Sequence, residues 1–175
     1  MGLLGGMLGN AAKTSEYISE CQRYGIRILP PDINESGPDF RAYHNDGDKY
    51  IRFGLLALKN LGEGFVKRVI DERRDRPFTS FEDFVERLWG SDMNKRQLEA
   101  LIKSGAFDRL GVYRSRLLLA YEKIADHYQE RNRSNVAGQL DLFSLGGSDE
   151  KPKGYEYPDV PELSFSEKLR LEKEC

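Results

Sequence analysis

The chain has 175 residues, enough to bury a substantial core, with 39% apolar residues, 32% charged residues and a net charge of −2. The low apolar share and the high charged share indicate that part of the chain is solvated rather than packed. Two widely separated cysteines, Cys21 and Cys175, make no disulfide framework, and with only two histidines they argue against a zinc site. The apolar residues 1–9 are too few, and lack the basic flank, for a signal peptide or a membrane span, so we expect a cytoplasmic protein without a membrane partner.

The charge is divided unevenly along the chain. Residues 58–116 carry 13 Lys and Arg against 10 Asp and Glu, a net of +3, whereas residues 138–175 carry 5 against 9, a net of −4. The basic excess is small, so any contact with nucleic acid should be local rather than a broad electrostatic sheath.

The first third of the chain predicts one helix and several short strands. Apolar residues recur at helical spacing over 11–24, and Gly25 follows as a stop signal. Residues 26–29, 39–43 and 49–53 are β-prone, and the Asp-Gly pair between the last two predicts a hairpin.

A glycine hairpin over 58–70 is the central feature of the sequence. Apolar positions at helical spacing lie on both sides of Gly62-x-Gly64, which predicts a helix, a tight turn and a second helix. We expect the glycines to supply positive φ and to let a ligand approach the backbone. Lys67 and Arg68 follow one turn into the second helix, so a phosphate is the expected guest. A plain helical hairpin with a glycine turn is the alternative.

Further helices are predicted after this hairpin. We expect the second helix to continue to Arg74, with Arg73, Arg74 and Arg76 on or near its exposed end. Thr79 or Ser80 is expected to cap a short helix, and a further helix is expected over 94–103. The apolar stripes predicted to face the core are Phe81, Phe84, Val85 and Leu88 in the first of these helices and Leu98, Leu101 and Ile102 in the second.

Residues 106–117 repeat the pattern of the glycine hairpin. Gly111 is followed by Arg114 and Arg116 and then by a long helix expected from about residue 113 to 130. The repeat is imperfect, because Tyr113 stands where the second glycine is expected. Two such units would arise by chance less often than one, and together they would present two phosphate-facing loops on one compact body. The repeat therefore favours contact with DNA over a plain helical hairpin.

The chain then becomes polar up to Pro161, with little apolar periodicity, which is typical of a linker or a disordered tail. An apolar island interrupts it at residues 139–143. Exposed apolar side chains need a cover, so the island either packs onto the core of this chain or binds a partner.

Several motifs, in this order, resemble the alpha subunit of bacterial DNA polymerase III, a replicative C-family polymerase, and together they cover nearly the whole chain. They are YISEC at 17–21, GIRILPPDINES at 25–36, IRFGL at 51–55, KNLGEG at 59–64, NKR at 94–96, LEALIKSGAFD at 98–108 and QLDLF at 139–143.

The resemblance implies a mainly α, α+β architecture with a tandem helix-hairpin-helix bundle. Residues 1–57 would be the end of the fingers region with a β-hairpin, and residues 58–131 the tandem helix-hairpin-helix domain that holds duplex DNA. Residues 132–162 would be a flexible linker that carries the clamp-binding motif 139–143, and residues 163–175 the start of a truncated oligonucleotide-binding domain.

The resemblance also implies specific contact residues. The DNA-binding set would be Lys59, Gly62, Gly64, Lys67, Arg68, Gly111, Arg114 and Arg116, and the clamp-binding set Gln139, Leu140, Asp141, Leu142 and Phe143. Glu63 departs from the motif, because the residue between the glycines is apolar in helix-hairpin-helix motifs generally.

The function implied is that of a non-catalytic piece of a DNA-directed DNA polymerase, a nucleotidyltransferase. The metal-binding carboxylates of the palm and their Mg²⁺ would lie upstream, so we expect no catalytic residue, metal or cofactor in this fragment. The implied partners are double-stranded primer-template DNA, the sliding clamp (beta subunit) and the rest of the polymerase III holoenzyme. The alternative is a protein-interaction scaffold that positions the clamp-binding peptide with little DNA binding of its own.

Overall fold

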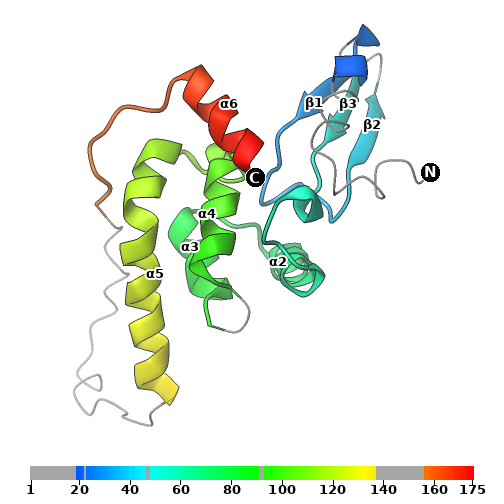
Figure 1. Ribbon diagram of the computed structural model, residues 1–175. Helices are drawn as coiled ribbons and strands as arrows, with labels where there is room; N and C mark the ends of the chain where they lie inside the picture. The colour runs from blue at the N-terminus through cyan, green and yellow to red at the C-terminus, as the bar shows by residue number, and fades with distance from the viewer. Residues whose placement is uncertain (1–18, 22, 46–47, 91–92, 137–155) are drawn as a thin grey trace.

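A computed structural model describes residues 19–21, 23–45, 48–90, 93–136 and 156–175 of the chain. These residues form a small three-stranded sheet set to one side of a helical unit (Figure 1). The prediction of a mainly helical α+β protein is confirmed. Within the described ranges, no helix combines the length and the apolar character that a membrane crossing requires.

The sheet consists of β1 (Arg27–Leu29), β2 (Arg41–Asn45) and β3 (Asp48–Arg52) in the order β1-β3-β2. β2 and β3 pair antiparallel, which confirms the predicted hairpin, and β1 adds to the other edge of β3 in parallel. Tyr43 and Tyr50 face each other across the hairpin, and their rings stack with centroids 4.8 Å apart. This cross-strand pair helps to fix the register of the two strands.

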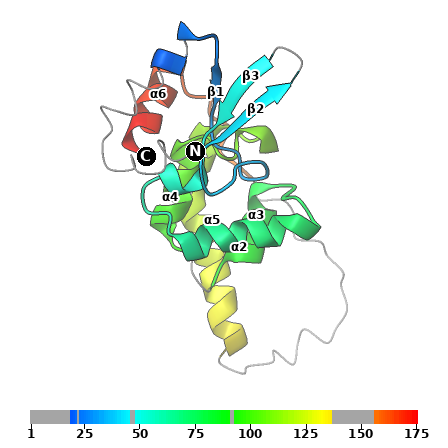
Figure 2. The same cartoon turned by 90° about the vertical axis from the view of Figure 1, so that its right-hand side faces the viewer.

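The helical unit follows the sheet in the chain. Its elements are the 3-10 turn η1 (Leu55–Ala57), the helices α2 (Glu63–Asp75), α3 (Phe81–Leu88) and α4 (Lys95–Lys103), the 3-10 turn η2 (Asp108–Leu110), and the helices α5 (Arg114–Val136) and α6 (Phe165–Glu174). α4 packs along α5, and α3 contacts both α2 and α5 (Figure 2).

The core of this unit is built from the predicted apolar stripes. All seven stripe residues of α3 and α4 are buried, as the helical spacing predicts. Phe81, Phe84 and Phe107 meet edge to face, with centroids 5.0–5.1 Å apart, and so lock α3 against the turn after α4. Ser80 caps α3 by accepting a hydrogen bond from the N–H of Asp83, also as predicted.

The turn after β1 joins the sheet to the helical unit. The Asp32 carboxylate accepts hydrogen bonds from two N–H groups of this turn, and the N–H of the buried Ile33 donates to the carbonyl of Ala106 at 2.9 Å. Arg73 of α2 donates to the carbonyls of Ile33 and Ser36. Arg74 and Arg76 are exposed at the end of α2 as expected, but Arg73 is half-buried, because these two carbonyls draw its guanidinium inward. Burial lowers the pKa of Arg73, and the neighbouring Asp32 opposes that effect.

The long helix α5 exceeds its predicted length. The polar run after Glu130 was expected to end it, but α5 continues to Val136 and extends past the other helices (Figure 2). Once a helix has formed, each added residue contributes a backbone hydrogen bond, so polar residues with fair helix propensity extend it without packing.

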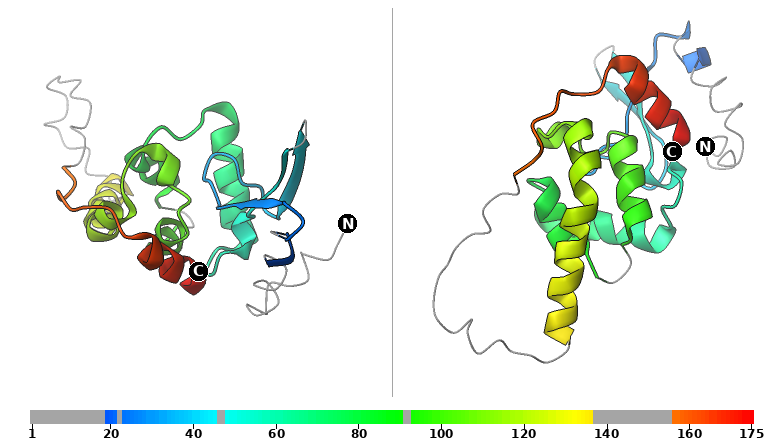
Figure 3. Two further views of the ribbon diagram at one scale, coloured as in Figure 1. Left: turned by 90° about the horizontal axis from the view of Figure 1, so that it is seen from above. Right: turned by 60° about the vertical axis from the view of Figure 1, so that its left-hand side comes forward.

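The last described segment lies against the helical unit. Residues 156–164, which we call the acidic strap, lead to α6, which lies across the ends of α4 and α5 (Figure 3). The Tyr157 hydroxyl donates to Glu82 of α3. The end of the segment expected to be a flexible linker therefore contacts the helices instead. Its contacts with α5 form part of the candidate interface.

Gly111 provides a test of the backbone geometry. Its φ is 84°, and a Cβ at this position would meet no atom within 4 Å, so only backbone strain opposes a side chain. Gly111→Ala should lower the free energy of unfolding by about 1–2 kcal/mol in urea denaturation. Gly64→Ala is the matched control, because Gly64 lies within α2 and also faces open space. Equal destabilisation by both variants would contradict the assigned geometry.

Candidate nucleic-acid interface

The first hairpin, residues 55–66, joins η1 to α2. Its reversal is made by Asn60, the one non-glycine residue with positive φ (66°) among the described residues. Gly62 is the N-cap of α2 with φ of −92°, and Gly64 lies within the helix. The expectation that the two glycines supply positive φ is therefore wrong, because the asparagine, which tolerates the left-handed conformation, already makes the turn.

The glycines of the first hairpin instead leave its backbone uncovered. Gly62, Glu63 and Gly64 are exposed, and a Cβ built on either glycine would meet no atom within 4 Å. Within the described part of the chain, no side chain caps this end of α2. The first N–H groups of a helix have no partner inside the helix, so this end can accept an anion.

Two cations lie one turn further along α2. Lys67 is exposed and Arg68 is half-buried, and both line a surface hollow of about 540 Å³. The other charged residues of the hollow are Arg76, Arg87, Asp71, Glu72 and Asp75. Four cations against three carboxylates leave a net charge of +1, so the hollow is only weakly basic.

The second hairpin, residues 108–117, joins η2 to α5 with the same backbone plan. Gly111 has positive φ three residues before α5 begins at Arg114, just as Asn60 has positive φ three residues before α2 begins at Glu63. The two hairpins therefore align Gly111 with Asn60 and Tyr113 with Gly62. The sequence alignment of Gly111 with Gly62 was wrong by two residues, because the glycines were matched by type rather than by conformation.

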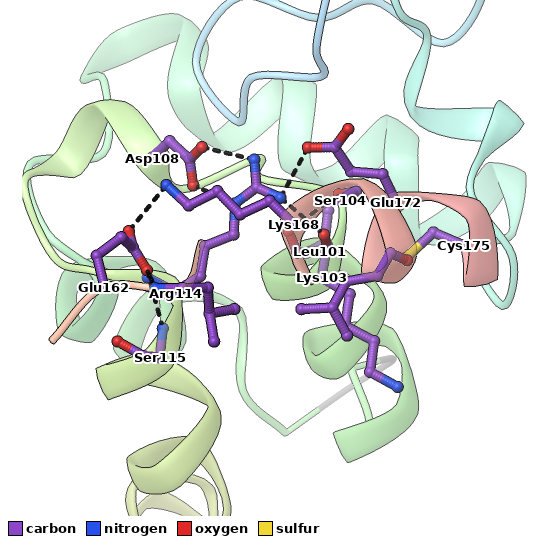
Figure 4. Close-up of polar contacts among 12 residues, drawn as sticks. Leu101, Lys103, Ser104, Asp108, Arg114, Ser115, Glu162, Lys168, Glu172 and Cys175 are labelled. Carbon is purple, nitrogen blue, oxygen red and sulfur yellow. Dashed lines mark hydrogen bonds and ion pairs between the residues drawn. The ribbon is translucent and has the colours of Figure 1, made fainter. Parts of the chain in front are cut away.

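Arg114 lies inside the protein rather than on the surface of the second hairpin. Its side chain is 4% exposed, and its guanidinium makes two hydrogen bonds of 2.7 Å to the Asp108 carboxylate. It also donates to Glu172 of α6 at 2.8 Å and to the carbonyl of Lys103 at 3.1 Å (Figure 4). Burial lowers the pKa of Arg114, but these carboxylates outweigh burial and raise the pKa overall. We therefore leave Arg114 out of the proposed interface.

A carboxylate occupies the N-terminus of α5. The two oxygens of Glu162 accept hydrogen bonds from the N–H groups of Arg114, at 3.3 Å, and Ser115, at 3.4 Å (Figure 4). Lys168 pairs with the same carboxylate at 3.1 Å. Burial raises the pKa of Glu162, but the hydrogen bonds from Leu163, Lys168 and Ser115 hold it below its ordinary value.

Two further predicted contact residues are engaged by the C-terminal segment. Arg116 pairs with Asp159 of the strap at 2.8 Å, donates to the carbonyl of Val160 and stacks on the Tyr113 ring. Lys59 donates through Nζ to the carbonyl of Glu174 at 2.8 Å. In the first hairpin the helix end at Gly62 and Gly64 is therefore open, although Lys59 is bonded to the end of α6. In the second hairpin the helix end is covered by acidic residues.

The predicted clamp-binding residues 139–143 lie outside the described residues. Among the residues that the structure describes, no three His, Cys, Asp or Glu side chains are grouped so that they could hold a metal ion.

A family model described as a helix-hairpin-helix motif matches residues 25–117, more than half of the chain. The chain belongs to the helix-hairpin-helix family. The match begins just before β1 and ends in the first turn of α5, so this helix-hairpin-helix unit includes the sheet and both hairpins.

Curated relatives confirm the resemblance to DNA polymerase III alpha subunits. The subunit of Mycobacterium tuberculosis is 36% identical over 175 residues, which cover 97% of this chain and 14% of that protein. The subunit of Thermus aquaticus is 40% identical over 167 residues, which cover 93% of this chain and 12% of that protein. The subunit of Bacillus subtilis is 35% identical over 173 residues, covering 99% and 15%. The chain therefore spans only 12–15% of the length of these relatives.

The different environments of Arg114 and Arg116 predict different effects on stability. Arg114→Ala leaves two carboxylates without their partner, and both are about one-third exposed, so we expect a loss of about 2–3 kcal/mol in urea denaturation. Arg116→Ala is the matched control and should cost less than about 1 kcal/mol, because its partner Asp159 is 98% exposed. An unchanged stability of Arg114→Ala would contradict the structural role assigned to this arginine.

Proposed function

We propose that this chain is a DNA-holding segment of a polymerase III alpha subunit, which grips duplex DNA by sequence-independent phosphate contacts at the first hairpin. The observation that carries the proposal is the exposed, uncapped N-terminus of α2, with glycines at 62 and 64 and with Lys67 and Arg68 one turn away. The polymerase context is supported by the relatives, which are DNA polymerase III alpha subunits.

The chemistry of this helix end suits a phosphate. Its partial positive charge and free N–H groups attract an anion, and the absence of a Cβ at both glycines lets the phosphate reach the backbone. The cations then add charge without reading bases, because phosphate oxygens are the same for every sequence. Sequence-independent binding is what a polymerase needs behind its active site.

The grip of the chain by itself should be weak. The hollow beside Lys67 carries a net charge of only +1, and Glu63 places a carboxylate at the helix end itself. Within the complete polymerase, further contacts would raise the effective concentration of DNA at this site. Catalysis would occur elsewhere in the alpha subunit, and this chain would contribute no catalytic group.

Salt titration of duplex binding tests this proposal. For the 175-residue chain, the plot of log affinity against log salt should fall, and Lys67→Ala/Arg68→Ala should reduce its slope by about one for each phosphate that the chain no longer neutralises. Fluorescence anisotropy with a labelled duplex provides the measurement.

Arg96→Ala/Lys123→Ala is the matched control, because it removes two exposed cations from α4 and α5. It should leave the slope nearly unchanged. Binding that is absent or independent of salt would instead favour the scaffold alternative. One observation supports this alternative: Arg114 and Arg116 are each paired with a carboxylate of the same chain, Asp108 and Asp159 respectively.

We further propose that residues 139–143 tether the polymerase to its sliding clamp. The motif Gln-Leu-Asp-Leu-Phe resembles the internal clamp-binding motif of the polymerase III alpha subunits. In this mode the Gln139 amide orients the peptide, while Leu142 and Phe143 fill an apolar groove on the clamp.

Leu142→Ala/Phe143→Ala should abolish binding to a purified clamp in surface plasmon resonance and leave the melting temperature unchanged. Leu145→Ala, just beyond the motif, is the control and should bind as the unaltered chain does. Unchanged affinity of the double variant would refute the tether.

A further inference from the structure

The acidic strap places its carboxylates where a phosphate would bind the second hairpin. Glu162 accepts from two successive N–H groups at the N-terminus of α5, which is the position that remains open at α2. Asp159, three residues earlier, pairs with Arg116. One short segment thus supplies anions both to the backbone donors of this hairpin, where Glu162 is seen in Figure 4, and to its half-buried cation Arg116.

The strap is attached by polar contacts and by Tyr157, which packs against the hydrophobic core. None of the residues 156–164 is fully buried, and α6 buries none of its residues. Phe165, where α6 begins, is 78% exposed. The ion pair of Asp159 with Arg116 is of the exposed kind that contributes little stability and is weakened by competing ions, because Asp159 is 98% exposed. Displacing the strap would break these polar contacts and the packing of Tyr157, and would expose no strap residue that is fully buried.

The alignment of the two hairpins indicates what displacement would uncover. α5 begins three residues after the positive φ of Gly111, as α2 does after Asn60, so both helix ends present the same backbone donors. With Glu162 removed, the N–H groups of Arg114 and Ser115 would become available. Arg116, freed from Asp159, would add a cation near the same end. Arg114 would stay inside through its pair with Asp108.

We propose that the acidic strap competes with duplex DNA for the second hairpin, so that DNA engages the α5 N-terminus and Arg116 only when Glu162 and Asp159 leave them. This inference rests on the proposed function, because it assumes that DNA phosphates are the competing anions. The first hairpin binds DNA in either state, and the second adds its contacts after the strap is displaced.

Glu162→Gln/Asp159→Asn tests the competition in the 175-residue chain. The variant weakens both strap contacts. At low salt it should bind a labelled duplex about five- to tenfold more tightly than the unaltered chain does. Its plot of log affinity against log salt should be steeper by about one, because Arg116 then neutralises a phosphate. Glu86→Gln/Glu130→Gln is the control for the change in net charge, because both residues are exposed and lie on other parts of α3 and α5.

Arg116→Ala separates release of the strap from a general charge effect. In the unaltered chain it should change duplex affinity by less than twofold, because Arg116 is held by Asp159. In the Glu162→Gln/Asp159→Asn background it should remove most of the increase in affinity. Hydrogen exchange gives an independent readout, since duplex should accelerate exchange in residues 156–164 of the unaltered chain.

The outcomes distinguish this inference from the proposed function. If the chain binds duplex through Lys67 and Arg68 but Glu162→Gln/Asp159→Asn binds no more tightly than the charge control, the competition is wrong and the proposed function stands. If Arg116→Ala weakens the unaltered chain as much as it weakens the double variant, the competition is also wrong. If no variant binds duplex at all, both proposals fail.

Discussion

The buried guanidinium of Arg114 is the interaction on which the second hairpin depends. It connects the carboxylates of Asp108 and Glu172 to the carbonyl of Lys103, and so holds η2, α6 and the end of α4 around the start of α5. Its position also explains Gly105, which has φ of 82° and where a Cβ would lie 2.2 Å from Nη2 of Arg114. A single residue type is therefore required at that turn by both backbone conformation and space. A charge that the sequence offers as a DNA contact is used here to shape the fold.

The two hairpins show how the same backbone plan produces different sites. Both reverse at a residue with positive φ and begin a helix three residues later. At α2 the helix end is bare and is followed by Lys67 and Arg68, so its N–H groups face solvent. At α5 the equivalent end is occupied by Glu162. What distinguishes the two helix ends is therefore the acidic strap, which covers the start of α5. The end of α6 also bonds Lys59 of the first hairpin, but it leaves the start of α2 uncovered.

Much of the fold could be predicted from local patterns in the sequence, whereas the state of the candidate site could not. The apolar stripes of α3 and α4, the Ser80 cap and the β2–β3 hairpin depend on spacing within a few residues, and each was correct. The reversal at Asn60 was missed because glycine is the usual residue with positive φ. The inward position of Arg114 had a signal, since it lies three residues before the buried Leu117 on the same helix face. Glu162 had none, because a contact across 47 residues leaves no local pattern. The acidic excess of residues 138–175 was visible in the sequence, but it identified neither Glu162 nor its partners.

The contacts of Glu162 and Asp159 with the second hairpin connect the acidic end of the chain to its basic part. An acidic segment that docks on its own basic hairpin neutralises part of the small basic excess that could attract DNA, so the isolated chain should bind more weakly than its sequence suggests. The same contacts exclude weak competing anions, because an intramolecular carboxylate is present at a high effective concentration. Under the proposed competition, a duplex held elsewhere in a larger assembly would overcome that advantage, since its phosphates would then be local as well. Competition of this kind would favour DNA already held by the assembly over a stray anion in solution.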